Sequence, residues 1–224
     1  MAADTVRENL ERVTALLLGP GFGMADTTGE FLKRLFGDTV AKKSGSLGFV
    51  KMPETESRKE NHILPPLIID ADGLKLLAKL PDWAARLPKP AVLTPHPGEM
   101  SALTGLETAE IQADRLSIAE RFAAEWGQVI VLKGAFTVIA APDGRTMIIP
   151  VASSALARAG SGDVLAGLIA GLRAQGMEAF EAAAAGAWIH AQAGLLAAEM
   201  QGNTATVLAG DLLNVLPDVL EQLL

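Results

Sequence analysis

The residues with the clearest chemical potential form the stretch Gly160-Ser161-Gly162-Asp163, which stands at the start of an apolar helical pattern. The pattern predicts a helix that runs to about Gln175. Backbone N–H groups at a helix start have no intrahelical partner, and glycines let a phosphate approach them closely. A carboxylate beside such an anion would handle a proton or a metal ion. The alternative is that Asp163 only caps the helix.

Two further carboxylates, Asp70 and Asp72, follow the apolar run 66–69, which is typical of a buried strand. A helix is predicted directly after them, over residues 74–80. The carboxylates could contact a metal ion or a sugar hydroxyl, or they could cap that helix and accept hydrogen bonds from loop amides. We favour a functional role for one of the two.

A histidine and a glutamate, His96 and Glu99, follow a third apolar run at 91–94. Pro95 and Pro97 restrict the backbone on both sides of the histidine, so its position is fixed. The pair suggests a substrate contact together with a group that positions a metal-bound water or a phosphate. The alternative is a rigid turn in which Glu99 caps the next helix.

A lysine, Lys133, stands at the end of the fourth apolar run, 129–132. With Thr137 it could meet the phosphates or ribose of a nucleotide; alternatively, it extends along apolar surface into solvent. Of the other histidines, His190 lies in an apolar helical pattern and is interpreted as a core histidine or as one that supports a site residue, rather than as a ligand. His62 is interpreted as a surface histidine.

The elements that must position these residues alternate between strands and helices. The apolar runs predict buried strands at 15–18, 66–69, 91–94 and 129–132, the first closed by glycines 19–23. Two short segments around Pro142-Asp143-Gly144 predict an antiparallel hairpin at one edge, over 136–140 and 146–149. Helical periodicity predicts helices at 27–36, 74–80, 108–126, 161–175, 178–200 and 211–223. The sequence therefore predicts an α/β sandwich around a mostly parallel sheet.

Three local features carry their own expectations. Thr27 or Thr28 is expected to cap the helix that follows. Gly186 and Gly194 suit close packing of the long helix 178–200 on the sheet. Residues 37–66 are charged and poorly periodic, which favours a long mobile loop.

Composition excludes several classes of protein. The 224 residues carry a formal net charge of −7, which argues against nucleic-acid binding. No cysteine is present, so disulfides and thiol nucleophiles are excluded. No apolar run reaches the length of a membrane span, and residues 1–11 have no signal-peptide pattern. We expect one cytoplasmic α/β domain over residues 1–224.

Four separated stretches match the pattern of one known family, in order. They are Gly19 to Gly23 (GPGFG), Ile69 to Gly73 (IDADG), Leu93 to Glu99 (LTPHPGE), and Lys133-Gly134 followed by GSGDVLAG at 160–167. Together they resemble the ADP-dependent NAD(P)H-hydrate dehydratases, ribokinase-like lyases that repair hydrated NADH or NADPH with ADP or ATP. The resemblance implies a three-layer sandwich with helices on both faces of the sheet.

The resemblance also implies a role for each candidate residue. Asp163 would be the catalytic base, and amides around Gly160 and Gly162 would stabilise the phosphoryl charge. The hydrated dinucleotide would contact Gly21, Gly23, Asp70 and His96. The adenine nucleotide would lie against Lys133, Gly134, Ala135, Phe136, Thr137, Ser161 and Gly162. Glu99 would help to place Mg²⁺ through a water molecule. The family further implies a homo-oligomer and, in a longer parent protein, an epimerase domain.

The chain departs from the family pattern in two places. Only about a dozen residues precede the first strand, where the family has another strand–helix unit, so we expect an N-terminally shortened domain. Residues 152–158 (ASSALAR) replace a stretch that often contains asparagine. Two other interpretations stay open: a different ribokinase-like small-molecule kinase, and a catalytically silent fragment that binds adenine nucleotide.

Overall fold

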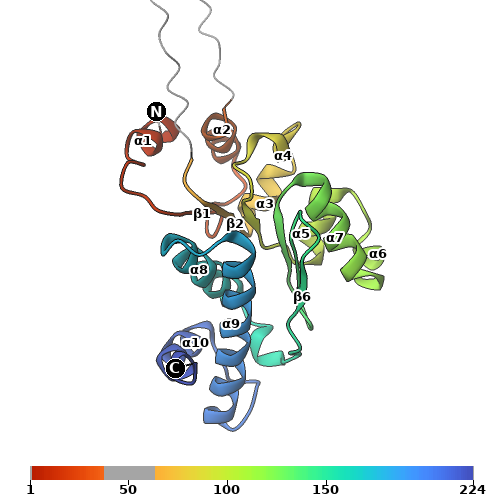
Figure 1. Ribbon diagram of the computed structural model, residues 1–224, viewed down its shortest axis with the longest axis vertical. Helices are drawn as coiled ribbons and strands as arrows, with labels where there is room; N and C mark the ends of the chain where they lie inside the picture. Colours follow the sequence, from red (N-terminus) through yellow and green to blue (C-terminus); the bar gives the residue numbers. More distant parts are fainter. Residues whose placement is uncertain (1, 38–63, 224) are drawn as a thin grey trace, which may run out of the picture.

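The computed structural model describes residues 2–37 and 64–223. The predicted loop at 37–66 lies almost entirely outside these residues, and so does His62. Within the described part, strands and helices alternate along the chain as predicted (Figure 1).

The described strands form one six-stranded sheet in which neighbours in space are neighbours in sequence. The strands are β1 Leu16–Leu18, β2 Leu67–Ile69, β3 Val92–Leu93, β4 Val129–Leu132, β5 Val138–Ala140 and β6 Thr146–Ile148. β1 to β4 are parallel, and β5 and β6 continue the sheet antiparallel. The predicted buried strands and edge hairpin are therefore confirmed.

Helices cover both faces of the sheet (Figure 1). One face packs against helices α1 Ala2–Glu8, α2 Asp26–Leu35, α3 Asp72–Leu77, α4 Trp83–Arg86, α5 Pro97–Thr104, α6 Thr108–Ala113 and α7 Arg115–Trp126. The other face packs against helices α8 Ser161–Ala174 and α9 Ala179–Gln201. The 3₁₀ turn Ser154–Leu156 and helices α10 Ala209–Asn214 and α11 Leu216–Glu221 pack against these two helices. In the described part of the chain, no helix combines the length and the apolar character needed to cross a bilayer.

Strand β2 shows why these runs are apolar throughout. Leu67 and Ile69 belong to the core on one side of the sheet, and Ile68 belongs to the core on the other. Successive side chains of a strand point to opposite faces, so a strand covered by helices on both sides needs apolar residues at every position.

The predicted helix at 108–126 is two helices, α6 and α7. The break falls at Asp114, whose backbone leaves helical geometry (φ −144°, ψ 69°) and whose side chain accepts a hydrogen bond from the Ser117 N–H at 3.1 Å. The prediction was wrong because the apolar spacing continues through the break: Ile111 and Ile118 are both buried.

Two further predictions about helices were also wrong. The helix at 211–223 is divided into α10 and α11 at Val215, and Pro217 lies in the first turn of the second helix, where its missing N–H is not needed. Helix α2 starts after Ala25 without a side-chain cap, and Thr28 instead donates to the carbonyl oxygen of Phe22 at 3.5 Å.

The two glycines of the long helix α9 contact α8 and the 3₁₀ turn rather than the sheet, which corrects their expected role. A Cβ atom on Gly186 would lie 2.7 Å from Cγ1 and 3.3 Å from the backbone nitrogen of Ile169 in α8. A Cβ atom on Gly194 would lie 2.3 Å from Leu156 Cδ2. These glycines set how closely α8 and the 3₁₀ turn approach α9.

We predict that Gly186→Ala lowers the free energy of unfolding by about 1–3 kcal/mol, because its methyl group overlaps the Ile169 side chain and presses on the backbone of α8. The matched control is Gly171→Ala, at an exposed position of α8 where a Cβ atom meets nothing within 4 Å. That change should stabilise the protein by about 0.5–1 kcal/mol through helix propensity. Urea unfolding measures both; equal effects would contradict the close-packing explanation.

Candidate active site at the carboxyl ends of the parallel strands

The loops that follow β1 and β2 lie in contact. Gly19 adopts φ +123°, and a Cβ atom there would lie 1.8 Å from the carbonyl oxygen of Asp70. The Gly23 N–H donates to Asp72 Oδ2 at 3.0 Å, and Lys75 Nζ lies 3.2 Å from Asp72 Oδ1. Asp72 therefore holds the glycine loop, while Ala71 occupies the N-cap position of α3 without a side-chain cap.

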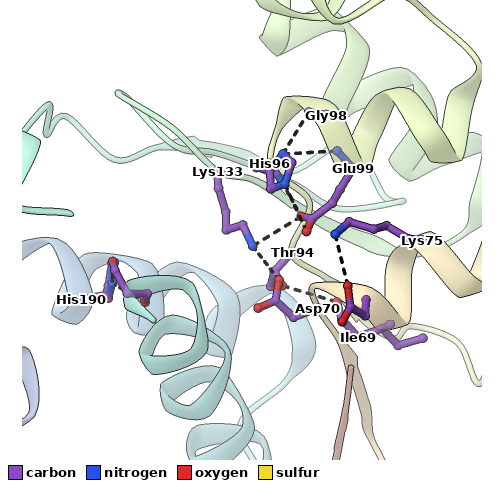
Figure 2. Close-up of polar contacts among 11 residues, drawn as sticks. Ile69, Asp70, Lys75, Thr94, His96, Gly98, Glu99, Lys133 and His190 are labelled. Atoms are coloured by element: carbon purple, nitrogen blue, oxygen red, sulfur yellow. Dashed lines mark hydrogen bonds and ion pairs between the residues drawn. The ribbon is translucent and has the colours of Figure 1, made fainter. Parts of the chain in front are cut away.

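A buried ion pair joins the ends of β2 and β4 (Figure 2). Lys133 Nζ lies 2.6 Å from Oδ1 of Asp70, a residue with 1% of its surface exposed. The Thr94 hydroxyl, at the end of β3, donates to the same oxygen at 2.7 Å. Lys133 Nζ also lies 3.6 Å from Glu99 Oε2. Lys133 therefore does not extend into solvent; it lies between two carboxylates.

His96 and Glu99 form the N-terminal cap of α5. His96 Nδ1 accepts hydrogen bonds from the N–H groups of Gly98 at 3.0 Å and Glu99 at 3.3 Å, which places the ring proton on Nε2. That nitrogen lies 3.2 Å from Glu99 Oε1, and Glu99 Oε2 accepts from the His96 N–H at 2.9 Å. The structure therefore confirms the rigid turn in which Glu99 caps the next helix. The His96 side chain is still 50% exposed, so it also faces solvent.

Glu99 is buried yet held as an anion. Burial acts to raise its pKa, but the hydrogen bonds from His96 and the positive charge of Lys133 outweigh this effect. The pKa of Glu99 therefore lies below its ordinary value of 4.5.

The N-terminus of α8 meets this cluster. Gly160 is its N-cap residue, at φ +84°, where glycine is favoured. A Cβ atom on Gly162 would lie 3.4 Å from Lys133 Nζ and 3.8 Å from Asp70 Oδ2. In the first helical turn the Ser161 N–H donates to the Arg158 carbonyl oxygen, whereas the N–H groups of Gly162 and Asp163 are free among the described residues and lie next to a lysine, an arrangement suited to a phosphate.

Asp163 lies in the first turn of α8, is exposed, and does not cap the helix. Among the described residues none donates a hydrogen bond to its carboxylate. Asp163 borders a groove of about 540 Å³ next to α10 and α11.

A cavity of about 800 Å³ opens on the Lys133 side of the same helix end. Most of the residues predicted to contact the nucleotide line it: Lys133, Gly134, Ala135, Thr137, Ser161 and Gly162. His96 and His190 also line it. Phe136 does not; its backbone adopts φ +55° and its side chain is largely exposed. Gly21, Gly23, Asp70 and Glu99 lie outside the cavity wall, as do Gly160 and Asp163.

Two residues of the site were missed in the sequence. Thr94, already mentioned, supports Asp70. Arg115, in the first turn of α7, donates to the carbonyl oxygens of Leu132 at 2.6 Å and Ala135, and so holds the loop after β4. An exposed-looking arginine at a helix start gives no local signal of this role; a threonine at a strand end does indicate proximity to the site.

The fold and the site define the class of protein. A mostly parallel sheet between two helical layers, with a glycine-rich helix start above the carboxyl ends of its strands, is a ribokinase-like α/β sandwich, and solved ribokinase-like structures align with it. In open α/β sheets, ligands bind at these strand ends.

The chain belongs to the NAD(P)H-hydrate dehydratase family, whose model matches residues 1–218. It is 42% identical over 222 residues to the bifunctional NAD(P)H-hydrate repair enzyme Nnr of Moorella thermoacetica, covering 99% of this chain and 37% of that enzyme. It is also 42% identical over 153 residues to the ADP-dependent (S)-NAD(P)H-hydrate dehydratase of Neisseria meningitidis, covering 67% of this chain and 52% of the relative.

A solved structure shows the same similarity. The ADP/ATP-dependent NAD(P)H-hydrate dehydratase of Bacillus subtilis, co-crystallised with ATP and Mg²⁺ and soaked with CoA, aligns with a TM-score of 0.72 and 30% identity. The alignment covers 93% of this chain and 66% of that one. The chain thus spans between about a third and two thirds of the length of these relatives.

We predict that Lys133→Met lowers the free energy of unfolding by about 3–5 kcal/mol, because it leaves the buried Asp70 carboxylate without its cation. The double variant Asp70→Asn/Lys133→Met should recover most of this loss, since it removes both charges. Urea unfolding of the four proteins of this cycle gives the coupling energy. Additive effects would show that the ion pair contributes nothing.

A second prediction concerns pH. The folded-state pKa of Glu99 is lowered, so its carboxylate adds stability above the ordinary pKa of 4.5, and this contribution is lost as the pH falls through the folded-state value. The stability difference between the native protein and Glu99→Gln should therefore be constant between about pH 6 and 8 and shrink below about pH 4.5. A pH-independent difference in acid would contradict the assignment.

Proposed function

We propose that this chain dehydrates NAD(P)H hydrate to NAD(P)H, using ADP or ATP as phosphate donor. The observation that carries the proposal is the start of α8, where free backbone N–H groups, Lys133 and an exposed Asp163 meet at one helix end. The family match and the named activities of the relatives support the same reaction.

The adenine nucleotide would occupy the 800 Å³ cavity, with its phosphates against Ser161 and Gly162. Lys133 has three ammonium protons, and its two carboxylate neighbours engage at most two of them. The third proton and the helix N–H groups are available to phosphate oxygens. Electrostatic stabilisation of this kind is the main contribution of proteins to phosphoryl transfer.

The hydrate would be the phosphoryl acceptor, bound next to Asp163 at the helix start, with the β1 loop (Gly21, Gly23) and His96 as further predicted contacts. Asp163 removes the proton from the hydrate's hydroxyl group, and the hydroxyl oxygen forms a bond to the terminal phosphorus as the P–O bond to the donor breaks. The C–O bond then breaks, phosphate leaves, and loss of a proton from the neighbouring ring carbon restores the double bond of NAD(P)H.

Magnesium is implied by the ATP and Mg²⁺ in the Bacillus structure. The described residues contain no group of three or more metal-ligating side chains, and the carboxylates of Asp70 and Glu99 are paired with Lys133 and His96. The chain's own side chains therefore do not fit a resident metal site in this arrangement, and we assign no step to the ion. The proposed contact of Glu99 through water stays a prediction.

The relatives that carry two activities support the prediction of an epimerase domain in the parent protein. A homo-oligomer and a cytoplasmic location also stay predictions.

The proposal is tested by supplying the purified chain with hydrated NADH, Mg²⁺, and either ADP or ATP, and following the return of NADH absorbance. Nucleotide-dependent recovery is expected, and the active nucleotide identifies the donor. A folded chain that binds nucleotide but gives no recovery would favour a silent nucleotide-binding protein. Phosphorylation of another small alcohol would favour a different kinase.

We predict that Asp163→Asn lowers turnover by about a hundredfold or more, the usual contribution of a general base, and leaves the nucleotide Kd almost unchanged. Asp218→Asn is the matched control, since Asp218 is an exposed carboxylate in the first turn of α11. It should leave turnover unchanged. If Asp163→Asn lost both nucleotide binding and the folded state, Asp163 would be structural.

A further inference from the structure

A buried histidine, His190, belongs to the cavity wall. It lies in the middle of α9, is 8% exposed, and faces the start of α8 (Figure 2). Its Nε2 atom lies 3.0 Å from the Ser161 carbonyl oxygen and 3.0 Å from the Ser161 hydroxyl oxygen. The catalytic steps proposed above do not use this ring.

These two contacts determine which ring nitrogen carries the proton. A carbonyl oxygen can only accept a hydrogen bond, so Nε2 must be the donor to Ser161. In a neutral imidazole the other nitrogen, Nδ1, is then an acceptor. The contact with Ser161 therefore fixes a single tautomer of His190.

The ring stays neutral at physiological pH. Burial lowers the pKa of His190 to about 4; the hydrogen bond to the Ser161 carbonyl oxygen opposes this shift, and the positive charge of Lys133 adds to it. Nδ1 thus keeps its lone pair at neutral pH.

Nδ1 has no donor within the described part of the chain. Both hydrogen bonds of the ring are made by Nε2, to Ser161. The His190 residue lines the cavity, so a ligand bound there can supply a donor to Nδ1.

We infer that His190 Nδ1 accepts a hydrogen bond from the nucleoside part of the bound nucleotide and so contributes to its selection. The inference rests on the proposed function, which puts an adenine nucleotide in this cavity. An ionised phosphate has no proton to give and would be repelled by the lone pair. A ribose hydroxyl or the exocyclic amine of adenine can donate, and both belong to the nucleoside.

Two variants separate the role of Nδ1 as an acceptor from the hydrogen bond between Nε2 and Ser161 of α8. His190→Asn places its Oδ1 atom where Nδ1 stands and gives up the bond to Ser161. His190→Leu removes both. Binding of ADP, 2′-deoxy-ADP, 3′-deoxy-ADP and inosine diphosphate to the native chain and both variants is measured by calorimetry, and thermal melting checks that each protein is folded.

We expect the native chain to bind ADP about three- to tenfold more tightly than the one analogue that lacks the donor, the size of a neutral hydrogen bond. His190→Asn should keep this discrimination, and His190→Leu should lose it, with the affinity for that analogue unchanged. The analogue that loses affinity identifies the donor as the 2′-hydroxyl, the 3′-hydroxyl or the amine.

Equal discrimination in the native chain and in a folded His190→Leu variant would overturn the inference and leave nucleotide binding intact. If all three analogues bound the native chain as tightly as ADP, the inference would also be wrong. Absence of ADP binding to the native chain would instead contradict the proposed function. The two failures are therefore distinguishable.

Discussion

The ion pair between Asp70 and Lys133 is the contact on which the site depends. It connects the end of β2 to the end of β4, two strands that are not neighbours, across Thr94 on β3. The buried Asp70 carboxylate requires close geometry and a further hydrogen bond, which the Thr94 hydroxyl supplies, and Glu99 Oε2 lies 3.6 Å from the Lys133 ammonium as a second ion pair. This requirement fixes how the strand ends lie relative to one another, and the start of α8 packs directly on the pair at Gly162.

The same cluster sets the electrostatics around the helix start. Lys133 serves two carboxylates, so the cluster alone would repel an anion. The positive end of the α8 dipole and its free N–H groups offset that repulsion. The Nε2–H of His96 and its backbone N–H both face Glu99, and these contacts offset part of the charge of that carboxylate. A phosphate can therefore approach α8 although two carboxylates lie nearby.

Much of this arrangement could be predicted from local sequence, and the rest could not, for a physical reason. Apolar runs specify buried parallel strands, and glycines followed by apolar spacing specify α8. The partner of Lys133, the bonds of Arg115 and the link between His190 and Ser161 depend on how distant elements pack, which local patterns do not encode. The break at Asp114 was hidden for a related reason: burial of the helix face continues through it, so periodicity does not reveal the change in backbone direction.

The start of α8 brings the proposed phosphate contacts and the proposed base together. Ser161 and Gly162 line the cavity, and Asp163 follows them in the same helical turn. A nucleotide phosphate bound at this turn would therefore lie close to the carboxylate that is proposed to act on the acceptor. His190 of α9 is hydrogen-bonded to Ser161, so the position of α9 along α8 also fixes the first turn of α8. Gly186 sets the spacing of the same two helices, so packing far from the strand ends determines the geometry of the site.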